Sequence, residues 1–162
     1  ADLWAAFRTV PPVLGAAPPH DLRFPFDRRI LLRPWKTLFF DPEPHDDDPD
    51  RSTAWDRGRY LVEGPGHCTA CHTPRNVFGA LKTSQTLQGG IGLEGEEIPS
   101  LTPQSLERAG YDEENLAFAL KTGVDPDGDA LGGSMAEVVS GSTRFWTAKD
   151  RSAVATYLLM TD

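Results

Sequence analysis

The only two cysteines of this 162-residue chain lie three positions apart, and a histidine follows the second one directly. The stretch reads GHCTACHTPRN over residues 66–76 and contains Cys68, Cys71 and His72. In a helical turn, residues at i, i+3 and i+4 share one side, so the two thiols and the imidazole would face the same neighbour. This cluster constrains the fold more than any other feature, because the rest of the chain has to enclose whatever these three side chains hold.

The spacing C-x-x-C-H is the attachment signature of c-type haem. Two thiols on one side of a turn can form thioethers with the two vinyl groups on one porphyrin edge, and the histidine then presents Nε2 to the iron. We therefore predict that Cys68 and Cys71 attach the haem and that His72 is the proximal ligand. A thioredoxin-like redox pair would need a βαβ unit, which the chain lacks. A zinc site would need two further ligands, and His67 and His72 are the only nearby candidates.

The second axial position of the iron calls for another ligand. Met135 lies in LGGSMAEVV, where glycines let the backbone approach the porphyrin, and we predict that it is this ligand. Met160, in the YLLMTD tail, fits a core or helix-end position better. A methionine thioether favours Fe(II), and two filled axial positions leave no place for oxygen or peroxide. The alternatives are the other histidines, the last of them disfavoured because it adjoins the attachment site: His20, His45 and His67.

Several residues near the motif are candidates for contacts that support the haem. A backbone carbonyl near Pro74 is expected to accept a hydrogen bond from Nδ1–H of His72 and so to fix its tautomer. Pro99, in EIPSLTP, is a candidate for packing on the proximal side of the ring. The remaining candidates would contact a propionate or the ring edge, with a surface role equally compatible for the first two and core packing favoured for the last two: Arg75, Asn76, Tyr111 and Trp146.

Proline density divides the chain in two. Residues 1–51 hold nine of the fourteen prolines and one of the fifteen glycines. Each proline removes a backbone donor and fixes φ, so only short helical fragments are expected there, for example over 2–10. We interpret 1–51 as a proline-rich arm with an acidic linker and 52–162 as the haem domain. Residues 21–40 are basic and apolar, which indicates an arm laid over the main domain or, less favoured, a docking surface for a partner or a membrane interface.

The second part predicts a small all-α domain with long glycine-rich loops. Helices are expected over 53–63, opened by a capping box at Thr53 and Asp56, over 113–122, and from a second capping box at 147–150 to the end. Ala54, Gly58 and Leu61 share one face of the first helix. Gly58 and Tyr157 are expected to meet where the first and last helices cross. Long loops are unusual in a compact domain unless they wrap something.

Four stretches carry a resemblance to a known family: RGRYLVEGPGHCTACHTPRN, IPSLTP, LKTGVDPDGDALGGSMAEVV and AVATYL. Residues 52–162 resemble the class I cytochrome c domain, and more narrowly the cytochrome c subunits of bacterial periplasmic alcohol, sugar and aldehyde dehydrogenases. The resemblance implies a class I cytochrome c fold, one haem c with its iron, a periplasmic location and the ligand set His72 and Met135. The leading segment, AAFRTVPPV and the residues after it, is similar to the connector between haem domains in multi-haem members.

These observations predict a single-electron carrier and not an enzyme. The expected partners are a periplasmic dehydrogenase and a downstream cytochrome or oxidase of the respiratory chain. The net charge of −8 argues against binding to nucleic acid or to an anionic membrane by the chain as a whole, and no apolar run approaches the 18 residues of a membrane span. The alternatives are a haem enzyme or ligand sensor with a labile distal site, and a docking subunit in which residues 21–40 matter more than the haem.

Overall fold

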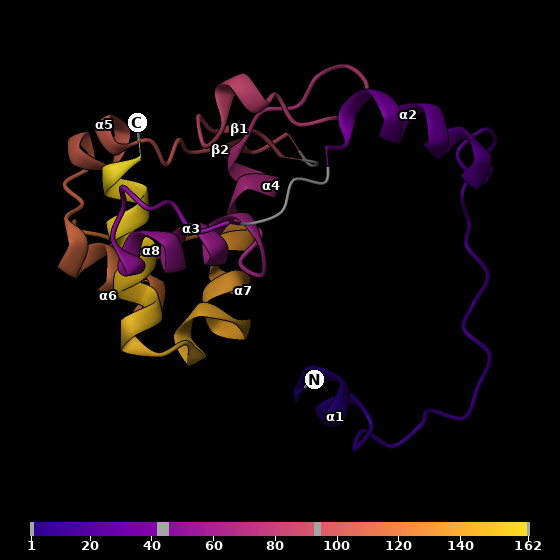
Figure 1. Cartoon of the computed structure of the whole chain (residues 1–162), viewed down its shortest axis with the longest axis horizontal. Helices are drawn as coiled ribbons and strands as arrows, with labels where there is room; N and C mark the ends of the chain where they lie inside the picture. Colours follow the sequence, from indigo (N-terminus) through magenta and orange to yellow (C-terminus); the bar gives the residue numbers. More distant parts are fainter. Residues whose placement is uncertain (1, 42–45, 93–94, 162) are drawn as a thin grey trace. The chain divides into compact units, whose positions relative to one another are not determined.

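The computed structural model describes residues 2–41, 46–92 and 95–161 (Figure 1). The chain divides into two units, the first ending at Asp41 and the second comprising the rest. Residues 42–45 of the expected acidic linker, including the candidate ligand His45, lie outside the described residues. No helix in the described ranges is both long enough and apolar enough to cross a membrane.

The first unit contains three short helical elements: α1 (Asp2–Phe7), the 3-10 helix η1 (Arg29–Leu31) and α2 (Leu32–Phe39). The sequence predicted a helical fragment near α1 but none at α2, because proline density argued against it. Pro34 lies in the first turn of α2, where backbone N–H groups have no intrahelical partner, so its missing donor costs the helix nothing. No described residue of this unit is buried.

The second unit is mostly helical, in agreement with the all-α prediction. Its α-helices are α3 (Thr53–Glu63), α4 (Cys68–His72), α5 (Pro103–Arg108), α6 (Glu113–Thr122), α7 (Gly133–Gly141) and α8 (Ala148–Met160). The 3-10 helices are η2 (Thr83–Gln85) and η3 (Thr143–Phe145). Two short antiparallel strands, β1 (Gly90–Ile91) and β2 (Glu97–Ile98), pair Gly90 with Ile98. The sequence did not predict α7.

Local capping signals account for the helix boundaries. Asp112 and Asn115 exchange side-chain to backbone hydrogen bonds of 2.8 Å at the start of α6, and Gly123 ends that helix with φ 77°. At α8, Thr147 Oγ1 accepts from the backbone N–H of Asp150 at 3.1 Å. For α3 the expected cap was one residue off, because the Ser52 hydroxyl and not Thr53 accepts from the backbone N–H of Trp55.

Helices α3 and α8 cross at the centre of the unit (Figure 1). Gly58 makes the crossing close: a Cβ added there would lie 2.6 Å from Tyr157 Cβ and would overlap the carbonyl oxygen of Ala153. The expected meeting of Gly58 and Tyr157 is confirmed. Ala54, which was expected on the packed face, is exposed, and Trp55 is buried instead with its ring edge against Tyr157 at 5.1 Å. The core around this crossing consists of Trp55, Leu61, Val62, Leu87, Leu106, Leu116, Leu120, Val154, Ala155, Tyr157 and Leu158.

An ion pair also joins the two helices, and it predicts a pH dependence. Arg57 Nε donates to Asp150 Oδ1 at 2.7 Å, and this hydrogen bond holds the pKa of Asp150 below its ordinary value. A lowered pKa stabilises the fold above the unfolded-state pKa, about 3.9, and that stabilisation is lost as the pH falls through the folded-state value. Since both side chains are partly exposed, Asp150→Asn should lower the free energy of unfolding at pH 7 by about 0.2–1 kcal/mol.

Urea unfolding of the Asp150→Asn variant and the parent at pH 7 and pH 3 measures this effect. The difference in the free energy of unfolding should shrink at pH 3, where the carboxyl of the parent is also protonated. An equal difference at both pH values would show that the charge of Asp150 is not its cause.

Candidate haem site

The helix α4 brings Cys68, Cys71 and His72 onto one turn, as the spacing predicts. Both cysteines are free thiols. Cys68 is half-buried and packs against the hydrophobic core, whereas Cys71 is exposed. Burial raises the pKa of Cys68 to about 11, so this thiol is protonated at neutral pH. One sulfur therefore lies at the core and the other at the surface, as expected for thiols that hold one edge of a large planar group.

His72 is oriented by a hydrogen bond from its ring. Its Nδ1 lies 2.8 Å from the carbonyl oxygen of Pro99, so the tautomer with a proton on Nδ1 donates there and leaves Nε2 available to a metal. Burial lowers the pKa of His72, although the bond to Pro99 acts in the opposite direction. The imidazole is therefore neutral at neutral pH, which is the form that binds iron.

The carbonyl that meets His72 differs from the one expected near Pro74. The Pro74 carbonyl accepts the backbone N–H of Lys82 at 2.9 Å, and Pro99, 27 positions after His72, supplies the acceptor instead. The sequence predicted packing beside the ring for Pro99. Its carbonyl could not be assigned from the sequence, because pairing across that distance depends on how the intervening loop folds.

Backbone contacts fix this loop against the motif. The backbone N–H of Gly89 donates to the carbonyl oxygen of His72 at 2.8 Å. The buried hydroxyl of Thr73 accepts from the backbone N–H of Leu87 at 3.0 Å, and the Leu87 carbonyl in turn accepts from the backbone N–H of Leu101 at 2.8 Å. Gly89 has φ 81° and lies so close to the backbone around Pro99 that a Cβ there would be 3.0 Å from the Pro99 carbonyl carbon. The segment 87–101 is thus held in place on the proximal side of His72.

Arg75 and Asn76, both candidates for a propionate, bond to the backbone in this structure. The guanidinium of Arg75 donates to the carbonyl oxygens of Gly79 at 2.7 Å and Ala70 at 3.0 Å. The Asn76 side chain accepts from the backbone N–H groups of Phe78 at 2.9 Å and Ala80 at 3.1 Å. These contacts shape the turn after the motif and tie it to α4, so both side chains have a structural role in this turn.

Met135 lies in the first turn of α7, after Gly132 and Gly133. Its side chain is half-buried and packs against the same hydrophobic core that Cys68 contacts. The sequence predicted a glycine-rich loop in this region, because α7 lacks a side-chain cap and begins with a glycine at φ 57°. The helix gives Met135 a defined position that a loop would not.

Trp146 lies beside the attachment motif. A Cβ added at Gly66 would be 3.0 Å from the Trp146 ring and 3.4 Å from Cys68 Sγ, so the three residues border one another. The buried guanidinium of Arg151 donates to the carbonyl oxygens of Thr143 at 3.4 Å and of Trp146, and so holds the turn before α8. The sequence missed Gly66 and Arg151, since an arginine on a terminal helix is ordinarily exposed.

Tyr111 is partly buried against the core, and burial, followed by Asp125 and Asp127, raises the pKa of its hydroxyl. Tyr111 and Trp146 therefore both pack on the core, the role favoured for them from the sequence.

The rival axial ligands are less well placed. Met160 ends α8 and is 53% exposed, His20 is exposed in the first unit, and His67 is an exposed residue with left-handed φ of 56° before α4. Across residues 2–41, 46–92 and 95–161, no three His, Cys, Asp or Glu side chains are grouped to hold a metal ion, so a zinc clip finds no ligand set there. The oriented His72, the paired free thiols and the half-buried Met135 fit a c-type haem.

Comparison with known proteins agrees with this site. No family model matches the chain. It is 45% identical over 159 residues to a diheme cytochrome c-type protein of Cereibacter sphaeroides, covering 98% of this chain and 52% of that protein. It is 37% identical to one of the subunits of nicotinate dehydrogenase from Pseudomonas putida, with 96% and 13% covered, and 36% identical to the fructose dehydrogenase cytochrome subunit of Gluconobacter japonicus, with 97% and 32% covered.

The chain thus spans about half the length of the first of these relatives and a smaller share of the other two. Relatives with the name alcohol dehydrogenase (quinone), cytochrome c subunit, and one named gluconate 2-dehydrogenase cytochrome c subunit, match over similar ranges. These matches extend over nearly the whole chain. The chain is homologous to the cytochrome c subunits of bacterial dehydrogenases.

Proposed function

We propose that this chain carries electrons one at a time through a single c-type haem, attached at Cys68 and Cys71, with His72 and Met135 as its axial ligands. The observation that carries the proposal is the contact between His72 Nδ1 and the Pro99 carbonyl, which fixes the tautomer with Nε2 free for iron. A haem bound in this way supplies an iron that cycles between Fe(II) and Fe(III). We assign this role to residues 52–162 and treat 1–51 as a separate arm.

The haem number follows from the motif count. The chain has one C-x-x-C-H stretch and no cysteine outside it. The diheme relative is matched over only 52% of its length, so one haem in this chain agrees with two in that longer protein.

The chain's own residues limit reorganisation around the site. The Pro99 carbonyl keeps the imidazole from rotating, and burial keeps it neutral. Cys68 and Met135 both pack on the core formed at the α3–α8 crossing, so the two sides of the site share one rigid support. A support that changes little between oxidation states suits an electron carrier.

The partners we propose are a periplasmic dehydrogenase as donor and a downstream cytochrome or oxidase as acceptor. The names of the relatives support the donor class, since they include the cytochrome subunits of alcohol, fructose and gluconate dehydrogenases. Thioether attachment of haem to a bacterial chain fits the periplasm. The chain would then be the electron-accepting part of a complex in which another subunit oxidises the substrate.

The Met135→Ala variant tests the axial ligand. It should keep the covalent haem, because the thioethers and His72 are unchanged, but should expose a coordination position on the iron. The reduced variant is then expected to bind carbon monoxide, whereas the parent binds little, and the oxidised variant should lose the methionine–Fe(III) charge-transfer band.

Met160→Ala is the matched control, since it removes the other methionine from an exposed helix end. It should leave carbon monoxide binding and the charge-transfer band as in the parent. If the parent itself binds carbon monoxide readily, the alternative of a ligand sensor or haem enzyme with a labile distal site replaces the electron carrier.

A further inference from the structure

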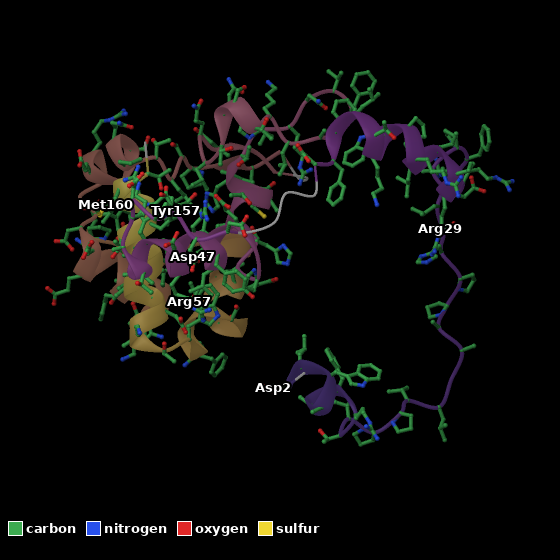
Figure 2. The ribbon with its side chains drawn as sticks, viewed as in Figure 1. Asp2, Arg29, Asp47, Arg57, Tyr157 and Met160 are labelled. Carbon is green, nitrogen blue, oxygen red and sulfur yellow. The ribbon has the colours of Figure 1, made fainter. Side chains whose placement is uncertain are left out.

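The first unit exposes a large set of apolar side chains. Between Asp21 and Phe40 the exposed fraction is 78% for Phe24, 80% for Phe26 and 73% for Leu38. The second unit, by contrast, buries many of its large aliphatic residues in one core. Figure 2 shows the side chains of this segment, including the labelled Arg29, standing away from the ribbon. The other exposed apolar residues of the segment are Leu22, Ile30, Leu31, Leu32, Phe39 and Phe40.

The helix α2 places its apolar residues on one side. At 100° per residue, Leu31, Leu32, Trp35, Leu38 and Phe39 fall within one stripe, and the Trp35 and Phe39 rings contact each other at 5.6 Å. The opposite side carries the polar residues Arg33, Lys36 and Thr37. This is the pattern of a helix that lies in the plane of an interface, with its apolar side down and its basic side toward the headgroups.

Charge is unevenly distributed along the chain. Residues 21–40 hold five basic and two acidic residues, whereas residues 42–162 hold ten basic and twenty acidic ones. Salt screens charges over about 8–10 Å, so the local excess of basic residues decides what this segment binds, and the net charge of −8 does not. The basic members are Arg23, Arg28, Arg29, Arg33 and Lys36.

We propose that residues 21–40 bind the surface of an anionic phospholipid bilayer, with the apolar side of α2 between the headgroups and the acyl chains. The phenylalanines and Trp35 supply aromatic groups suited to that depth, and the arginines and Lys36 pair with lipid phosphates. The segment is only partly helical and none of its residues is buried, so its apolar groups form no shaped surface for a folded protein to match. A fluid planar interface needs no such shape.

The test measures flotation of the full chain with vesicles. Vesicles of phosphatidylcholine with about 30% phosphatidylglycerol, an anionic fraction that attracts basic segments, are compared with vesicles of phosphatidylcholine alone. The chain should partition onto the anionic vesicles, and raising the salt from low to high concentration should reduce the bound fraction. Binding is read from the protein itself, so it does not depend on whether the haem assignment is correct.

Two neighbouring substitutions separate the apolar side from the polar one. Leu38→Glu and Thr37→Glu add the same charge one residue apart, the first on the apolar stripe and the second on the opposite side. Loss of one buried leucine weakens partitioning about tenfold or more, whereas one added negative charge alone weakens it about fivefold. Leu38→Glu should therefore bind clearly less than Thr37→Glu, and neither should change the absorption spectrum, since both lie outside the haem unit.

Three results would overturn the proposal: no flotation with anionic vesicles at low salt, equal flotation with neutral vesicles, or equal losses for the two variants. The first would mean that the segment meets a protein instead. The second would remove the role of the basic residues, and the third would remove the role of the α2 face.

Discussion

Replacing Cys68 and Cys71 together with serine should yield a chain without covalently attached haem. Serine keeps the size and the helical turn of α4 but cannot form a thioether, so the porphyrin loses both covalent bonds. The core at the α3–α8 crossing contains neither cysteine among its fully buried members, so the chain itself should persist. Acid–acetone extraction should remove all colour from the variant and leave the colour of the parent on the polypeptide.

His67→Asn is the matched control for this experiment. His67 adjoins Cys68, is exposed, and has the left-handed φ of 56° that asparagine tolerates. The variant should retain covalent haem at the level of the parent. If instead the double serine variant kept its colour after extraction, the attachment assignment would be wrong.

Gly58→Ala should unfold the haem unit or leave it severely destabilised. The new methyl group would overlap the Ala153 carbonyl oxygen and lie 2.6 Å from Tyr157 Cβ, so α3 and α8 would have to move apart. Overpacking of this kind costs about 1–3 kcal/mol or more, and the contact with a rigid backbone carbonyl puts this site at the upper end. The gain of about 1 kcal/mol in helix propensity does not offset it. Guanidinium unfolding followed by circular dichroism measures the loss.

Gly141→Ala is the matched control, because it changes a second helical glycine with no heavy atom within 4 Å of the added Cβ. It should be neutral or slightly stabilising through helix propensity. A Gly58→Ala variant as stable as the parent would show that the α3–α8 crossing is looser than described. Since Cys68 and Met135 both rest on this core, a destabilised Gly58→Ala variant should also lose the charge-transfer band before it unfolds.

Local signals predicted the helices that have them. The caps Asp112 and Thr147 and the stop at Gly123 define α6 and α8 because each forms a short-range hydrogen bond or backbone turn. Helix α7 has no side-chain cap and begins with glycine, so its sequence predicts a loop. Helix α2 was missed because the cost of a proline depends on its place in the helix, and Pro34 lies in the first turn.

The attachment motif, the candidate ligand Met135 and the Gly58–Tyr157 crossing could all be predicted from the sequence, because each follows from the chemistry or the size of single residues at a fixed spacing. Only the tertiary structure decided that the Pro99 carbonyl, not one near Pro74, orients His72, and that Arg151 and Gly66 set the position of Trp146. Spacing along a helix is fixed by covalent geometry, whereas contacts across 27 residues depend on which of many loop closures best satisfies buried backbone groups. The sequence therefore predicts which residues meet the haem iron, and the fold determines how they are held.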